Sequence, residues 1–98
     1  MKLNLIQDDI DAGSHERTRG QDRCTTCPLS HMFTRLTGRL CGVSALEVWV
    51  FHLPRVDVPL TDAMRETVDM ADYGDSELVP RIFDFPDESW AKLIGGDV

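Results

Sequence analysis

Residues 27–51 are the stretch that decides the fold, and their sequence is CPLSHMFTRLTGRLCGVSALEVWVF. In its first half, apolar residues recur at the i, i+3, i+4, i+7 spacing of one buried helix face: Leu29, Met32, Phe33 and Leu36. Pro28 suits a first helical turn, and Gly38 can end the helix in a left-handed conformation. The stretch therefore predicts a helix over residues 27–37.

The second half of the stretch, residues 40–51, alternates in the way a half-buried strand does. Cys41, Val43 and Ala45 share one phase of this alternation, and Leu46, Val48 and Val50 share another, with Trp49 and Phe51 on the opposite face. The change of phase between Ala45 and Leu46 predicts a bulge or a tight turn between two strands.

Weaker signals on both sides of this stretch complete the order of elements. They predict strands at residues 3–6, 56–58 and 78–85, helices at 61–73 and 88–94, a turn or single helical turn ending at Gly13, and a polar loop at 14–23. We expect an α+β domain spanning residues 1–98, with a small antiparallel or mixed sheet of three to four strands. Two main helices and a short C-terminal helix would accompany this sheet.

The charge of the chain is unevenly distributed. The net charge is −7, and residues 1–56 hold seven Lys or Arg against six Asp or Glu, or +1. Residues 57–98 hold three Lys or Arg against eleven Asp or Glu, or −8. This acidic half should repel nucleic acid directly, but it would attract the basic surface of another protein.

The sequence also leads to expectations about membrane association, cellular location and enzymatic activity. No apolar stretch approaches the roughly 20 residues that span a bilayer, so no membrane partner is expected. The acidic start at Asp8 and Asp9 does not resemble a signal peptide, which favours a cytoplasmic location. His31 and His52 have no nucleophile at a recognisable spacing, and no glycine-rich phosphate loop occurs. We therefore expect no enzyme and no catalytic residue.

Three cysteines raise the question of a metal site. Cys24 and Cys27 have the Cys-x-x-Cys spacing of structural zinc sites, and Cys41 and His31 could complete a Cys₃His set. This set predicts, as one alternative, a small zinc-stabilised interaction module. A strong zinc signature has a second close pair of ligands, and this chain lacks one.

Two other interpretations of the cysteines stay open. A Cys-x-x-Cys pair at a helix start is also the pattern of a thiol-redox site or a regulatory disulfide. In the simplest interpretation there is no cofactor, Thr25 or Thr26 caps the helix, and Cys27 and Cys41 are small buried apolar residues.

The acidic half offers candidate partner-binding residues. Carboxylates on and after the second main helix could occupy a basic groove in place of nucleic acid, and Trp90 is the aromatic residue expected to be partly exposed beside a partner. The full candidate set is Glu66, Asp69, Asp72, Asp75, Glu77 and Trp90.

The pattern resembles a family of small, mostly uncharacterised proteins of bacteriophages and prophages. The resemblance lies in Gln7–Gly13, in the Cys-x-x-Cys-Pro-Leu segment from Cys24 to Leu29, and in the Pro59-Leu60 helix start. A helix ending near Asp72 and Gly74 and a closing strand at 79–85 also match. The segment from Ser14 to Asp22 is longer than expected for the family.

The resemblance implies a phage or mobile-element origin and supplies no catalytic residues. By analogy with small acidic phage proteins, it implies an inhibitor of a host defence protein, such as an anti-CRISPR protein. The expected partner is a host protein, with a nucleic-acid-binding defence component as one version, and the expected location is the host cytoplasm.

Overall fold

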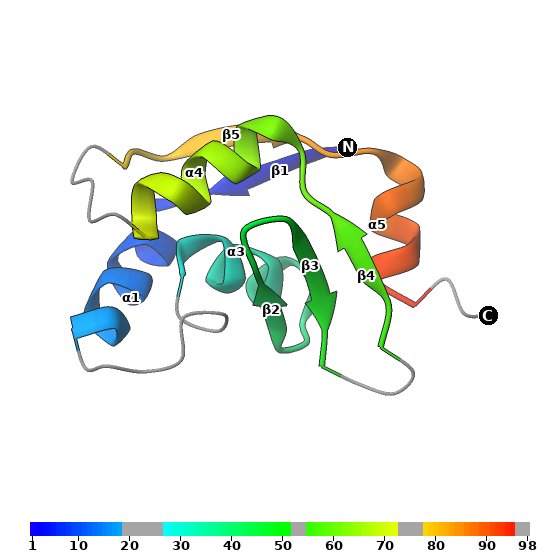
Figure 1. Ribbon diagram of the computed structural model, residues 1–98, viewed down its shortest axis with the longest axis horizontal. Coiled ribbons are helices and arrows are strands. Elements are labelled where there is room, and N and C mark those ends of the chain that lie inside the picture. The colour runs from blue at the N-terminus through cyan, green and yellow to red at the C-terminus, as the bar shows by residue number, and fades with distance from the viewer. Residues whose placement is uncertain (19–26, 52–54, 73–77, 96–98) are drawn as a thin grey trace.

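The computed structural model describes residues 1–18, 27–51, 55–72 and 78–95 (Figure 1). In chain order its elements are β1 (Lys2–Leu5), α1 (Gln7–Thr18), α3 (Pro28–Thr37), β2 (Cys41–Val43), β3 (Glu47–Val50), β4 (Asp57–Pro59), α4 (Asp62–Asp72), β5 (Arg81–Asp84) and α5 (Asp87–Leu93). The predicted α+β class is confirmed.

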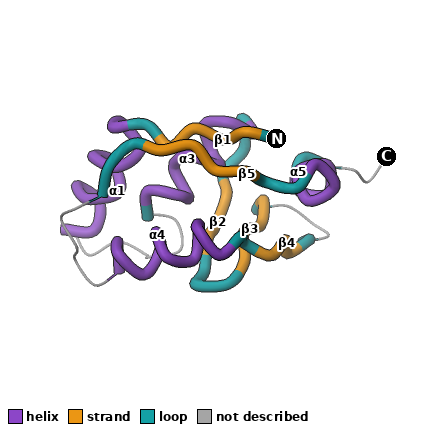
Figure 2. The backbone as a smooth tube through the Cα atoms, turned by 90° about the horizontal axis from the view of Figure 1, so that it is seen from above, coloured by secondary structure: helices purple, strands orange, loops and turns teal. Residues whose placement is uncertain are grey.

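The strands form the expected small antiparallel sheet, which has three strands, and a second antiparallel sheet of two strands that was not predicted. β2, β3 and β4 lie side by side in that order, and β1 pairs separately with β5 (Figure 2). The second sheet was not predicted because β1 and β5 come from opposite ends of the chain. Strand signals in a sequence do not say which distant strand each one pairs with.

The three-stranded sheet follows the predicted alternation. Val48 lies between Val43 and Val58, and all three are buried on the inner face. The predicted break between Ala45 and Leu46 is a turn, in which the Ser44 hydroxyl accepts hydrogen bonds from the backbone N–H of Leu46 at 3.2 Å and of Glu47 at 3.1 Å. This turn changes the phase of the alternation.

α3 has the predicted buried face and a well-defined start and end. The Cys27 sulfur caps its start by accepting a hydrogen bond from the Ser30 backbone N–H at 3.4 Å. Gly38 ends the helix with φ of 74°, a left-handed conformation that favours glycine, and its N–H donates to the Thr34 carbonyl. The expected caps Thr25 and Thr26 lie outside the described residues.

α1 extends the expected single turn at Gly13 to Thr18, so Ser14–Thr18 are helical rather than part of a polar loop. Its sequence has no apolar stripe, and Ile10 is its one large buried apolar residue in the part whose side chains are described. α1 packs against α3, where Asp9 accepts hydrogen bonds from Arg35. A helix held this way leaves no periodic signal in the sequence.

The two sheets and the helices share one buried apolar cluster. Phe33 of α3 meets Phe85 edge to face, with 5.5 Å between ring centroids. α5 packs against β3 and β4 and buries Leu93 in the same cluster. Within the described part of the chain, no helix is long and apolar enough to cross a bilayer.

Candidate partner-binding surface

α4 places acidic side chains on the surface by anchoring its opposite face in the core. The Thr61 hydroxyl accepts a hydrogen bond from the Met64 N–H at 3.3 Å, which caps the helix start. Met64 and Val68 are buried in the apolar cluster, and the buried Thr67 hydroxyl donates to the Ala63 carbonyl at 3.0 Å. These contacts fix the rotation of the helix about its axis.

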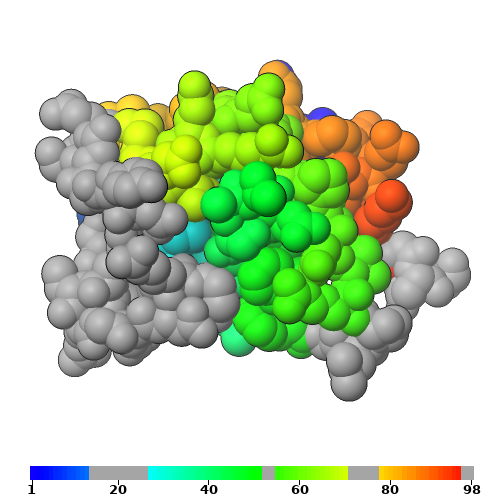
Figure 3. All heavy atoms as spheres, in the orientation of Figure 1, coloured from blue at the N-terminus to red at the C-terminus, as the bar shows by residue number. Residues whose placement is uncertain are grey.

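The outward side of α4 carries an acidic stripe, defined as Asp62, Glu66 and Asp69, all exposed. Their i, i+4, i+7 spacing keeps them on one helix face over about 10 Å of helix axis. Figure 3 shows α4 and the three-stranded sheet on the same side of the molecule, with α4 above the sheet.

The stripe has little internal charge compensation. Arg65 approaches Asp62 at 3.9 Å, the longest ion-pair distance among the described residues. Glu66 and Asp69 form no ion pair within the part of the chain that the structure describes. Two carboxylates are therefore available to a cation from outside.

The structure brings together only part of the predicted partner-binding set. Glu66 and Asp69 lie on α4, as does the backbone of Asp72, whose side chain lies outside the described atoms together with Asp75 and Glu77. Trp90 lies on α5, at the other end of the molecule from the C-terminal end of α4 (Figure 1). It lies apart from the acidic stripe and is half-buried against the core.

Below the stripe, the outer face of the three-stranded sheet is aromatic. Trp49 lies against Gly42 on β2, so closely that a Cβ at Gly42 would come within 2.5 Å of the indole ring. The Arg55 guanidinium covers the ring at 3.9 Å from its centroid and pairs with Asp57 at 2.6 Å. Trp49 is thereby only 6% exposed.

Phe51 continues this outer face toward solvent. Its N–H donates to the Leu40 carbonyl at 3.0 Å, so Leu40 and Phe51 lie side by side, and they are 55% and 48% exposed. The ring of Phe51 meets Trp49 edge to face. The sequence placed Trp49 and Phe51 on one face, but the exposure of Phe51 depends on β3 ending at Val50 and on the sheet stopping there.

Two of the predicted metal ligands, Cys27 and Cys41, lie at the junction of α3 and β2. Ser30 contacts both buried cysteines, since its N–H donates to the Cys27 sulfur and its hydroxyl to the Cys41 carbonyl at 2.6 Å. Burial raises the pKa of the Cys41 thiol, although hydrogen bonds from Thr37 and Thr34 act in the opposite direction. Both sulfurs are thus buried and hydrogen-bonded at this junction.

The rest of the predicted ligand set is not assembled in the described structure. Cys24 lies outside the described residues, and His31 is half-buried on α3. Within the described ranges, no group of three or more potential ligands could hold a metal ion. The zinc module stays a prediction that depends on Cys24.

Comparisons with known proteins add no assignment. No family model matches the chain, and neither the curated proteins nor the solved structures contain a match.

Proposed function

We propose that this chain is a non-catalytic binding protein that engages a basic surface of a partner protein through the acidic stripe of α4. The observation that supports this most is the state of Glu66 and Asp69, which are exposed and unpaired among the described residues on a helix whose other face is fixed in the core. Charges held on a rigid helix lose little entropy on binding a partner.

The partner that we propose is a host protein, and the proposed role is inhibition of a host defence component by a phage protein in the host cytoplasm. The support for this part is the resemblance to small phage proteins together with the −8 charge of residues 57–98. A basic groove that normally holds nucleic acid is a fitting target, because it presents Lys and Arg side chains to phosphates along one line. The stripe presents carboxylates along one line as well.

The experiment is a capture assay with host lysate that compares the wild type with Glu66→Lys/Asp69→Lys. The matched control is Asp8→Lys/Glu88→Lys, which changes the net charge equally at exposed helix starts on α1 and α5. We expect basic proteins to be captured by the wild type and the control and lost by the α4 variant, with capture weakening as salt rises.

Two results would oppose the proposal. Equal capture by all three proteins would show that α4 does not make the contact. Equal loss in the control and the α4 variant would show that only overall charge matters. Thermal melting of the three proteins establishes that each is folded.

The zinc alternative makes a separate prediction, and metal removal tests it. A zinc-stabilised module would purify with one zinc per chain in the absence of chelator, and a chelator or Cys24→Ser would lower its melting temperature, because zinc binding contributes directly to folding. Substoichiometric zinc and an unchanged melting temperature for Cys24→Ser would remove this alternative.

A further inference from the structure

The register of the three-stranded sheet places an aromatic ring beside a carboxylate on its outer face. Trp49 of β3 lies opposite Gly42 of β2 on one side and opposite Asp57 of β4 on the other. Residues that lie directly opposite one another in an antiparallel sheet share a face. The indole ring is therefore flanked by a position without a side chain and by an acidic one.

The Trp49 ring is held in place by packing. It lies so close to Gly42 that no Cβ fits there, and the ring of Phe51, which follows β3, meets it edge to face at 5.9 Å between centroids. The indole Nε1 is buried and has no hydrogen-bond partner within the described part of the chain. Ring contacts rather than a hydrogen bond thus fix the indole, which forms a preorganised aromatic surface.

A guanidinium of the chain itself lies on this surface. The central carbon of the Arg55 guanidinium is 3.9 Å from the centroid of the Trp49 ring, and its Nε donates to the Asp57 carboxylate at 2.6 Å. Arginine side chains characteristically stack on aromatic faces and pair with carboxylates. The ring and the carboxylate therefore form a site whose ligand chemistry is shown by the side chain that occupies it.

The occupant is a surface side chain with few other contacts. Arg55 precedes β4 and belongs to no strand, and its side chain is 50% exposed, against 36% for Asp57. Within the described ranges, the Arg55 side chain makes no hydrogen bond or ion pair other than the one with Asp57. An arginine from another protein could make the same two contacts without any change in the ring behind it.

We propose that Trp49 and Asp57 form a binding site for an arginine side chain of the partner protein, and that Arg55 occupies this arginine site until the partner displaces it. The proposal rests on the proposed function, since it names a side chain through which the basic partner is recognised. The sheet and α4 lie on the same side of the molecule (Figure 3). One basic surface can therefore contact the acidic stripe and the arginine site together.

In this arrangement Arg55 acts as an internal competitor. The apparent affinity of a ligand falls in proportion to the fraction of molecules whose site is vacant. Removal of the Arg55 side chain should therefore strengthen the binding of an external arginine. It also makes the surface more negative, so the test needs probes of equal charge and a control that loses the same charge elsewhere.

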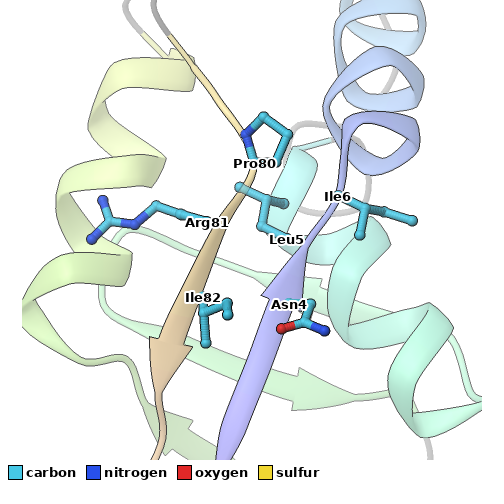
Figure 4. Close-up of a pocket in the computed structure, with 6 residues that line it drawn as sticks. All are labelled: Asn4, Leu5, Ile6, Pro80, Arg81 and Ile82. Atoms are coloured by element: carbon cyan, nitrogen blue, oxygen red, sulfur yellow. The ribbon is translucent and has the colours of Figure 1, made fainter.

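Arg81 of β5 provides this control. Its guanidinium also lies over an aromatic ring, at 4.8 Å from the centroid of Phe83. It extends from β5 toward α4 (Figure 4), and it makes no ion pair within the part of the chain that the structure describes. Arg81→Ala thus removes the same charge and a similar ring contact without opening a site that has a carboxylate.

The test compares pentalysine with the same peptide carrying a central arginine. Both are titrated into the full chain and followed by NMR at the indole N–H of Trp49, assigned with Trp90→Phe. Because the charges are equal, the ratio of the two affinities reports preference for a guanidinium. For Arg55→Ala we expect the arginine peptide to bind about three- to tenfold more tightly than pentalysine. The wild type should show a smaller preference because Arg55 competes.

Three further variants sharpen the result. Arg55→Lys keeps the charge and should give an intermediate preference, since an ammonium is the weaker competitor. Arg55→Ala/Asp57→Asn should reduce the preference to about twofold or less, because the carboxylate is gone. Arg81→Ala should keep the wild-type preference. Equal affinities of the two peptides for Arg55→Ala would overturn the proposal, as would an equal rise in preference in Arg81→Ala.

The stripe variant distinguishes failure of this proposal from failure of the proposed function. Glu66→Lys/Asp69→Lys should weaken the binding of both peptides alike and leave their ratio unchanged. Undiminished binding of both peptides to this variant, with the arginine preference of Arg55→Ala intact, would oppose the proposed function and support the arginine site. Loss of both peptides in the stripe variant, with no preference in Arg55→Ala, would overturn the arginine site and leave the acidic stripe as the contact.

Discussion

The two sheets of this protein differ in how their strands come together. β2, β3 and β4 are consecutive in the chain, and short connections join them. β1 and β5 lie at residues 2–5 and 81–84, and their pairing brings distant parts of the chain together. Local pairing closes short loops, whereas the β1–β5 ladder must close a loop of most of the chain, which costs more entropy.

The outer edges of the two sheets also differ in which helix contacts them. On the outer edge of β2, Ser30 and Thr34 of α3 hydrogen-bond the backbone of Cys41, and on that of β1, Arg35 of the same helix hydrogen-bonds the Asn4 carbonyl. On the outer side of β5 lies α4 instead (Figures 2 and 4). α3 therefore hydrogen-bonds outward backbone groups of one edge strand in each sheet.

The largest effect should come from breaking the long-range ribbon. Phe83 is 1% exposed and lies opposite Leu3. Phe83→Ala should lower the free energy of unfolding by about 3–5 kcal/mol, because it leaves a cavity beneath the ribbon. Ile82→Ala, the next residue but 62% exposed, should change it by less than about 0.5 kcal/mol. Urea unfolding measures both, and similar values would contradict the placement of β5.

A smaller effect tests the local sheet. Gly42→Ala should lower the free energy of unfolding by about 1–3 kcal/mol, because the new Cβ would meet the Trp49 ring at 2.5 Å. The double variant Gly42→Ala/Trp49→Val removes the ring, so the glycine substitution should cost less in that background than alone. A double-mutant cycle from chemical unfolding gives the coupling. Additive effects would show that the two residues are not in contact.

Comparing the predicted elements with the observed ones shows which parts of the fold can be predicted from the sequence. α3 and α4 carry apolar residues at helical spacing and have Pro28 and Thr61 at their starts, so local rules find them. The turn at Ser44 leaves a visible change of phase. α1 was missed because Asp9 and Arg35, not an apolar stripe, hold it to α3. The number of sheets was missed because it depends on long-range pairing.

Some features of the candidate sites can likewise be predicted from local sequence rules, and others depend on tertiary packing. The exposure of Glu66 and Asp69 follows from the spacing of Met64 and Val68, so the sequence predicts the acidic stripe. The position of Trp90 on a separate part of the surface depends on how α5 docks. Which backbone groups of β5 face β1 depends on the phase of the ladder set by Phe85 and Met1, and no local pattern reports that phase.

A third prediction concerns the helix that covers the edges. Asp9 has a side chain that is 5% exposed, and its carboxylate accepts hydrogen bonds from Arg35 at 2.9 and 3.3 Å. Arg35→Met should lower the free energy of unfolding by about 1–2 kcal/mol, because it leaves this carboxylate without its cation; partial exposure of Arg35 moderates the effect. Asp9→Asn/Arg35→Met should recover part of the loss. No recovery would show that Arg35 acts mainly through its bond to Asn4.

The smallest effect concerns Cys41, at the covered edge of β2. Because burial raises the pKa of this thiol above 9.0, the folded protein keeps the proton at a pH where the unfolded chain begins to lose it. The contribution of Cys41 to stability should therefore be complete below pH 9 and decline as the pH rises through the folded pKa. Unfolding measured from pH 7 to pH 10 for the wild type and Cys41→Ala tests this. The wild type should lose more stability over this range than the variant, since other titrating groups are common to both. Parallel pH profiles would show that the Cys41 thiol titrates in the folded protein as it does in the unfolded chain, and that the edge of β2 is open to water.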